Sequence, residues 1–426
     1  MKKQSTKSTS KKQVRRKRST RRADEAPIDE VISFQAGIRE ALVSQIRDAV
    51  TAMAEDLVLA EAEELLGARW SRKPDSTLRR GGYTNSRIFV GGEPVHIERP
   101  RVRDIATQTE HPLKAISALR SRDALDEDVK RLVVRGVTTR NYDDALGHLS
   151  DGLGLKKSAV SESFQRASQK DLDALNGRSL ADWSVSVIYI DGVDFGGTMC
   201  IVALGVTSEG EKKILGLLEG ATENSTVVRD LLANLKERDL QTPKRTLFVL
   251  DGSKALRKGV LSTFGKGALI QRCHLHKIRN VQSYLPKQYQ AEARRRLNVA
   301  WGMVTYEEAK AELESVLAWL KTLSTSAANS LEEAFEDSLT VHFLGITDLL
   351  RKTLVTTNPI ESAFDTVRTL SKRVKRWNGT SMVLRWAGSG LVRAEAQFRR
   401  VKGYKALPDL LNALESDTLQ PTRVVA

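Results

Sequence analysis

Cysteine is nearly absent from this chain of 426 residues, in which only Cys200 and Cys273 occur. Two thiols cannot build the disulfide framework of a small secreted domain, and their scarcity suits a reducing compartment. No apolar run approaches the ~20 residues that a membrane-spanning helix needs. The N-terminal stretch is basic and polar, without the apolar core of a secretory signal. These absences predict a cytoplasmic protein.

Acidic residues are also in the minority. The chain has 68 Lys and Arg against 53 Asp and Glu, with a net charge of +15 and a pI of about 9.7. Residues 1–22 contain no acidic residue at all. Such an excess of positive charge indicates a polyanionic partner, and nucleic acid is the first candidate. We expect residues 1–26 to be a disordered basic tail and the protein to associate with DNA, as a nucleoid-associated protein does.

The next region, residues 27–118, is predicted to be helical with one basic β-hairpin. A helix is expected over 31–68, where Ile38, Leu42, Ile46 and Val50 repeat every four residues. Residues 87–97 indicate the hairpin, with Gly91-Gly92 as its turn.

The basic stretch 99–103 follows this hairpin, and Pro100 should exclude it from a central strand. Its Arg101 and Arg103 are candidate DNA contacts.

Residues 119–178 are expected to form short helices. One helix is expected near 124–133 and a second over 142–149. This second helix, a Gly-containing turn at 152–154 and a polar third helix over 158–167 together resemble a helix-turn-helix. In that interpretation Gln165 and Arg166 face a DNA groove. An ordinary three-helix bundle explains the same pattern.

From residue 179 the pattern becomes α/β. Strands are predicted at 185–190, 198–206, 213–218, 247–250 and 268–270, with helices at 227–240 and 253–263. The first three strands have hairpin-length connections and should be antiparallel, whereas the later strands return through helices and should be parallel. This order is that of a ribonuclease H-like catalytic domain. We expect its first part at 179–287, a helical insertion at 288–355, its second part at 356–402 and a tail at 403–426.

Two carboxylates follow the ends of predicted strands, Asp191 after the first and Asp251 after the fourth. Ligands bind at strand ends in such sheets, and Mg²⁺ prefers carboxylate oxygens. Two ions ~4 Å apart can assist in-line phosphoryl transfer. Glu361, near the start of a late helix, is the expected third ligand.

Each of these residues also has a structural explanation. Asp-Gly is a common turn dipeptide, and Asp194 competes with Asp191 for the first position. Asn358 as an N-cap would place Glu361 at the third position of a capping box.

Cys273 and His276 form a C-x-x-H pair after the last predicted strand. Zinc sites usually have four protein ligands, or three and a water, and no second Cys/His pair is visible. We therefore expect a structural thiol and a hydrogen-bonded His near the carboxylates. After Glu361 the sequence is basic, and Arg368 and Arg373 are candidate contacts for substrate phosphates.

At these residues the chain resembles the Mutator-type bacterial insertion-sequence transposases, a branch of the DDE superfamily. The resemblance covers about 183–400 and rests on spaced segments: Ala203-Leu204-Gly205-Val206, Leu250-Asp251-Gly252, Gln271-Arg272-Cys273, His276-Lys277-Ile278-Arg279-Asn280 and Thr356-Thr357-Asn358-Pro359-Ile360-Glu361-Ser362.

The resemblance implies a catalytic triad of Asp191, Asp251 and Glu361 holding two Mg²⁺ ions, for which Mn²⁺ can substitute. It also implies double-stranded DNA as partner, both the terminal inverted repeats of an element and its target, and a homo-oligomer on that DNA. Two other functions stay open: a structure-selective nuclease of the same fold, and a DNA-binding regulator with an inactive catalytic domain.

Overall fold

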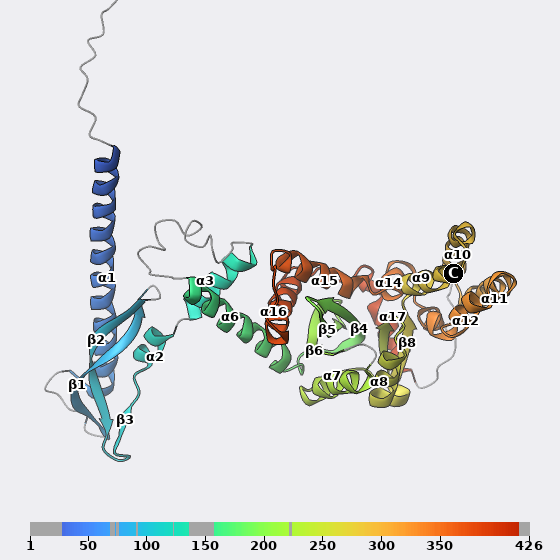
Figure 1. Cartoon of the computed structure of the whole chain (residues 1–426). Coiled ribbons are helices and arrows are strands. Elements are labelled where there is room, and N and C mark those ends of the chain that lie inside the picture. Colours follow the sequence, from blue (N-terminus) through green and yellow to red (C-terminus); the bar gives the residue numbers. More distant parts are fainter. Residues whose placement is uncertain are drawn as a thin grey trace, which may run out of the picture. The chain divides into compact units, whose positions relative to one another are not determined.

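The structure is a computed structural model that describes residues 28–68, 73, 76–90, 93–121, 123–135, 157–220 and 224–416 (Figure 1). Its described elements fall into two compact units, one comprising α1 to α2 and the other α3 to α17. The basic tail 1–26, the expected helix 142–149 and the predicted turn of the helix-turn-helix at 152–154 lie outside the described residues. Within the described part of the chain, no helix is long and apolar enough to cross a membrane.

The first unit packs a long helix against a small sheet. Its elements are α1 (Ile28–Leu66), β1 (Leu78–Val90), β2 (Glu93–Asp104), β3 (Thr109–His111) and α2 (Lys114–Arg120). β1 and β2 pair in antiparallel register up to Val90 and Glu93, which confirms the hairpin, although the predicted turn residues 91–92 are not described. Buried apolar side chains of α1, both long strands and α2 form the core of this unit.

The prediction that Pro100 keeps its segment out of a central strand was wrong, because β2 is the middle strand of the order β1-β2-β3. Two features accommodate the missing N–H of the proline. A register shift between Arg80 and Tyr83 lies opposite it, and Gly82 there has a φ of 82°. On the other side, β3 pairs only with Val102 to Asp104, beyond the proline.

The apolar repeat predicted for α1 does not lie in this core. Of its members, Ile38 is 54% exposed and Leu42 is 55% exposed. The helix instead packs through Ala54 and Val58 and the later residues Ala62 and Leu66, which continue the same four-residue repeat in its C-terminal half. The helical period was therefore predicted correctly, but the fold buries only the later part of the repeat.

The second unit is built on a mixed five-stranded sheet. Its strands are β4 (Val185–Phe195), β5 (Thr198–Thr207), β6 (Lys212–Glu219), β7 (Thr246–Leu250) and β8 (Ala268–Arg272). Their order is β6-β5-β4-β7-β8. The first three strands are antiparallel, whereas β7 is parallel to β4 and β8 is parallel to β7. This is the pairing that the connection lengths predict.

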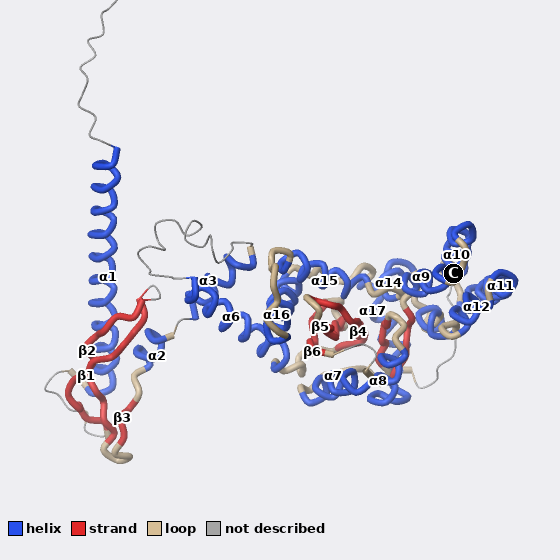
Figure 2. The backbone as a smooth tube through the Cα atoms, viewed as in Figure 1, coloured by secondary structure: helices blue, strands red, loops and turns tan. Residues whose placement is uncertain are grey.

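Helices cover both faces of this sheet, as Figure 2 shows. Alternate residues of β4 point to opposite sides, as the two-residue period of a strand requires. Ile188 and Ile190 pack toward α7 (Ser225–Glu237) and α8 (Lys254–Phe264). Val187 and Tyr189 pack toward the C-terminal helices α15 (Asn358–Ser371), α16 (Thr380–Ala396) and α17 (Leu407–Glu415). One face is thus sealed by helices that follow the sheet's own strands, and the other by helices from the end of the chain.

The helical insertion forms a core of its own beside β8. It contains α9 (His274–Ser283), α10 (Lys287–Ala300), α11 (Tyr306–Leu323) and α12 (Thr325–Glu332), and it begins earlier than residue 288. After the insertion, the chain continues through α13 (Thr340–Phe343) and α14 (Asp348–Leu354) to α15. Glu333 at the end of α12 anchors the insertion, because it accepts from Arg272 at 2.9 Å and from the buried Lys277 at 3.0 Å.

Two helices from the predicted DNA-binding region belong to the second unit. These are α3 (Asp123–Val134) and α6 (Lys157–Gly177), which is much longer than the predicted 158–167. α6 packs against both α3 and α16. Asp171 links the three, since it accepts from Lys130 at 2.7 Å and from Ser389 at 2.6 Å. This packing ties α6 to the body of the sheet unit.

Candidate active site

Asp191 lies inside β4 and not at its end. β4 and β7 pair in parallel only as far as Ile190 and Leu250, but β4 continues to Phe195 against β5. The prediction of a strand ending at Asp191 was therefore wrong in its boundary. Asp191 is buried at 6% exposure, and its Oδ1 accepts from the N–H of Gly192 at 2.8 Å.

Asp251 follows β7 directly, as expected. Ile190 of β4 pairs with Leu250, which is the last residue of β7. Asp191 and Asp251 are the residues that follow this pair, so they occupy neighbouring positions. The Oδ1 of Asp251 accepts from the N–H of Ser253 at 2.9 Å. Gly252, which lies between Asp251 and Ser253 in the sequence, has a φ of 135°. A Cβ at this position would lie 2.7 Å from the Arg272 guanidinium. The turn that carries Asp251 thus needs a glycine, and a buried arginine packs against it.

Glu361 comes from the first turn of α15. The capping box that offered a structural explanation for Glu361 is not formed, because α15 begins at Asn358, its N-cap is Thr357, and no side chain caps it. Instead the Thr357 hydroxyl donates to Glu361 Oε1 at 2.7 Å. Pro359 suits its place in the first turn, where its missing N–H costs no helical hydrogen bond.

The three carboxylates and His276 share one electrostatic environment. Burial raises the pKa of Asp191 to about 7, and the negative charges of Asp251 and Glu361 add to that rise. The pKa of His276 is also raised, first by its hydrogen bond with Cys273 and then by Asp191 and Asp251. His276 Nε2 lies 3.9 Å from Glu361 Oε1. The charges of Asp251, Glu361 and His276 therefore all act on Asp191.

Asp194, the competing candidate, has a different role. It is exposed near the β4–β5 turn, where its Oδ1 accepts from the N–H of Gly197 at 3.1 Å. Asp194 is thus a turn residue, and Asp191 is the strand-borne member of the cluster.

The donor set can be compared with what a metal ion requires. In the described part of the chain, no three His, Cys, Asp or Glu side chains are already arranged tightly enough to hold an ion. The chemistry of the carboxylates nevertheless fits Mg²⁺, which takes few protein ligands and keeps several waters. The negative charges of Asp191 and Asp251 also repel each other, and a bound cation would relieve that repulsion.

Cys273 and His276 lie where α9 begins beside the carboxylates. Cys273 is fully buried, and its Sγ lies 3.5 Å from the Thr357 hydroxyl. The Nδ1 of His276 lies 3.4 Å from the same hydroxyl. These contacts agree with the expected structural thiol and hydrogen-bonded histidine. Thr357 was not foreseen as a site residue; the only signal was its place just before the helix that carries Glu361.

We expect purified protein to contain no stoichiometric zinc, because Cys273 is buried in a hydrogen-bonded pair and not in a closed ligand set. Cys273→Ser should fold normally, since serine keeps a hydrogen-bonding group at almost the same position. Elemental analysis and thermal melting check both statements. One tightly held zinc per chain, lost in Cys273→Ser, would contradict them.

The predicted DNA contacts fall in both units. Arg101 and Arg103 lie on β2, where Arg101 pairs with Glu110 at 3.1 Å and Arg103 reaches Gln108 at 3.4 Å. On α6, Gln165 is exposed. Arg368 on α15 is 55% exposed beside Asp365, and Arg373 follows the end of that helix. These five residues stay predictions as DNA contacts.

Arg166 differs, because it has a structural partner. It forms two hydrogen bonds, both of 2.8 Å, with Asp126 of α3, whose side chain is 3% exposed. Removing the guanidinium leaves that carboxylate buried and unpaired. We expect Arg166→Ala to lower the free energy of unfolding by about 1–3 kcal/mol, below the full value for a buried pair because Arg166 is partly exposed. Gln165→Ala is the matched control, and its unfolding midpoint in urea should stay unchanged.

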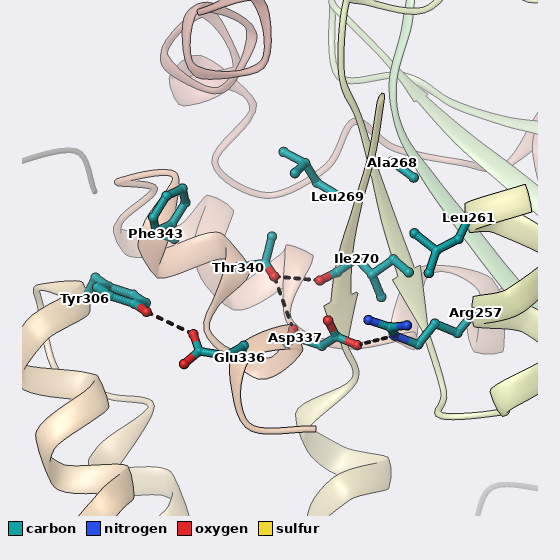
Figure 3. A pocket seen from close by; sticks show the side chains of 10 residues that line it. All are labelled: Arg257, Leu261, Ala268, Leu269, Ile270, Tyr306, Glu336, Asp337, Thr340 and Phe343. Carbon is teal, nitrogen blue, oxygen red and sulfur yellow. Dashed lines mark hydrogen bonds and ion pairs between the residues drawn. The ribbon is translucent and has the colours of Figure 1, made fainter. Parts of the chain in front are cut away.

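A cavity of about 270 Å³ lies elsewhere, between α8, β8 and the helical insertion (Figure 3). Arg257 and Asp337 pair across one side at 2.8 Å, and Tyr306 donates to Glu336 at 2.9 Å on another. None of the three carboxylates lines it. The cavity therefore belongs to the junction of sheet and insertion and not to the carboxylate cluster.

Comparison with known families decides the affiliation of the chain. The sequence profile described as "Transposase, Mutator family" matches residues 29–400. The chain belongs to this family. The resemblance inferred from the spaced motifs is thereby confirmed, and the match extends it through the N-terminal unit.

Relatives of this Mutator-family chain are transposases of insertion sequences. The transposase for element IS905 of Lactococcus lactis is 30% identical over 60% of this chain and 63% of its own length, just under two thirds. The transposase for element IS6120 of Mycolicibacterium smegmatis is 25% identical over 65% of this chain and 86% of its own length. The transposase for element ISRM5 of Rhizobium meliloti is 22% identical over 80% of this chain and 85% of its own length.

Proposed function

We propose that this chain cuts DNA at the ends of an insertion sequence and joins those ends to target DNA, with one active site formed by Asp191, Asp251 and Glu361. The observation that carries the proposal is their convergence. Asp191 on β4 and Asp251 at the end of β7 follow paired residues, and the charges of Asp251 and of Glu361 on α15 both act on the buried Asp191. Buried, mutually repelling carboxylates are costly in a purely structural role and are typical of functional sites.

We further infer that the sheet unit is ribonuclease H-like. Three antiparallel strands are followed by two parallel ones, in the order β6-β5-β4-β7-β8. Helices cover both faces, and the insertion enters after β8. The central strand β4 and its parallel neighbour β7 carry the two aspartates, so this order explains why residues far apart in sequence meet.

Asp191, Asp251 and Glu361 would hold two Mg²⁺ ions, or Mn²⁺ in their place. When bound, such ions supply the Lewis acidity that activates the attacking oxygen and stabilises the leaving oxygen of a phosphodiester. Asp191 is the natural shared ligand, because its charge interacts with both other carboxylates. Asp251 and Glu361 would each serve one ion. In strand cleavage, the attacking group would be water. In strand joining, it would be a freed 3′-hydroxyl, and the same three carboxylates would be used.

Double-stranded DNA is the substrate that the charge of the chain favours. Arg368 and Arg373 follow Glu361 on or just beyond α15 and would reach backbone phosphates near the cut. The N-terminal unit offers Arg101 and Arg103 on the central strand of a small sheet. We propose that the N-terminal unit and α6 supply recognition of the element ends, since phosphate contacts carry little sequence information.

The proposal is tested by incubating the protein with Mg²⁺, a labelled duplex carrying the element end, and a supercoiled plasmid. Cleavage followed by covalent joining to the plasmid supports a transposase. Cleavage without joining indicates a structure-selective nuclease, and binding without either reaction indicates a DNA-binding regulator. A regulator is the less favoured alternative, because all three carboxylates are present and interacting.

Deleting residues 1–22 should flatten the salt dependence of DNA binding while the preference for element ends over random DNA is retained. The segment is rich in Lys and Arg without acidic residues, so it adds charge and no base-specific recognition. Each phosphate that this segment no longer neutralises should reduce the slope of log affinity against log salt by about 0.9. Fluorescence anisotropy at several salt concentrations measures both quantities. Loss of the preference for element ends would show that this segment reads sequence.

A further inference from the structure

Thr357 occupies an unusual position next to the carboxylate cluster. It is fully buried and is the N-cap residue of α15. A threonine at an N-cap normally accepts from a backbone N–H of the first helical turn, but this side chain makes no such bond. Its hydroxyl donates instead to Oε1 of Glu361, one turn further on, at 2.7 Å. The hydroxyl therefore hydrogen-bonds to a carboxylate and does not cap the helix.

The surroundings of Thr357 fix the direction of that hydrogen bond. A hydroxyl has one hydrogen to donate, and its shortest contact is with Glu361 Oε1. It can then only accept from the Cys273 thiol at 3.5 Å or from His276 Nδ1 at 3.4 Å. Two backbone bonds hold this group together, Cys273 N–H to Leu250 O at 2.8 Å and His274 N–H to Val355 O at 2.9 Å. The end of β7, the start of α9 and the start of α15 are thereby joined at Thr357.

We propose that Thr357 is a positioning residue for Glu361. Its hydroxyl occupies one carboxylate oxygen and so limits rotation of the glutamate, whose Oε2 has no hydrogen-bond partner among the described residues and is left for a divalent ion. Groups that hydrogen-bond to metal ligands orient them and strengthen metal binding. The inference rests on the proposed two-ion site and deepens it, because it assigns the orientation of the third ligand to a specific buried hydroxyl.

The test measures metal binding and needs no catalysis. Full-length wild type, Thr357→Val, Thr357→Ser and Glu361→Gln are melted over a series of Mn²⁺ concentrations. Valine keeps the shape of threonine without the hydroxyl, and serine keeps the hydroxyl. We expect the Mn²⁺ concentration that gives half of the stabilisation to rise about 10-fold or more in Thr357→Val and to return to near the wild-type value in Thr357→Ser. Thr357→Ala replaces the valine variant if that variant does not fold.

The variants separate this inference from the proposed function. Glu361→Gln should lose most of the Mn²⁺ response. If it does, and Thr357→Val responds as wild type does, the metal site stands and the positioning role is wrong. If serine is as weak as valine, the bulk of Thr357 matters and not its hydroxyl, which also overturns the inference. If wild type itself gains no stability from Mn²⁺, the proposed metal site fails, and the inference fails with it.

Discussion

Asp251→Asn should abolish strand cleavage and leave DNA binding intact or slightly stronger. The amide keeps the shape of the side chain and one oxygen, so Ser253 N–H retains its acceptor. It removes a negative charge that a metal ion needs and that repels phosphate. A loss of about 4 kcal/mol of transition-state stabilisation corresponds to a cleavage rate roughly 1,000-fold lower. Single-turnover cleavage of a labelled element end measures the rate, and a mobility shift without metal measures binding.

Asp194→Asn is the matched control. It makes the same chemical change three residues beyond Asp191 on the same strand, but at an exposed aspartate that accepts from the N–H of Gly197. This variant should cleave at close to the wild-type rate. Equal losses in both variants, or wild-type cleavage by Asp251→Asn, would contradict the assignment of the cluster.

Gly252→Ala should cost both stability and activity. At a φ of 135° an alanine is strained, and its Cβ would lie 2.7–2.9 Å from three atoms of the Arg272 guanidinium. Arg272 cannot easily withdraw, because it is 3% exposed and bound to Glu333. We expect a loss of about 1–3 kcal/mol in the free energy of unfolding, and a displaced Asp251. A misplacement of about 1 Å can lower a reaction rate roughly 100-fold.

Gly265→Ala at the other end of α8 is the control for the backbone effect. Gly265 also has a positive φ, 55°, but a Cβ there would meet nothing within 4 Å. It should therefore lose stability to a similar or smaller extent while cleavage by the folded protein is unchanged. Equilibrium unfolding and single-turnover cleavage, measured on both variants, separate the two effects. Activity equally low in Gly265→Ala would show that the carboxylate turn is not specifically affected.

Much of the second unit could be predicted from local sequence patterns. Apolar strands, short connections up to β6 and helical connections after it were enough to predict which pairs are antiparallel and which are parallel. The candidate carboxylates were found in the same way, because strand ends and a late helix mark them. These features are local in sequence, and the fold follows from how they combine.

The errors concern features that depend on neighbours in space. The end of β4 was misplaced because pairing with β5 continues after pairing with β7 has stopped. Pro100 is tolerated in a middle strand because a bulge in β1 lies opposite it. Thr357 could not be recognised from its surroundings, since its partners Cys273 and His276 come from a distant part of the sequence. A pattern along one segment contains no information about such partners.

Glu361 lies in the last part of the chain and is therefore synthesised long after Asp191 and Asp251, which has a consequence for the growing chain. One face of the sheet, including Val187 and Tyr189, is covered by α15, α16 and α17, which are the last helices of the structure to leave the ribosome. Until α15 has emerged, a growing chain has both aspartates but no third carboxylate, and its sheet still exposes an apolar face. We therefore expect nascent or prematurely terminated chains to be unable to cut DNA at the proposed site and to be prone to aggregation. The order of elements along the gene thus means that the proposed site and the sealed core are both completed only late in translation.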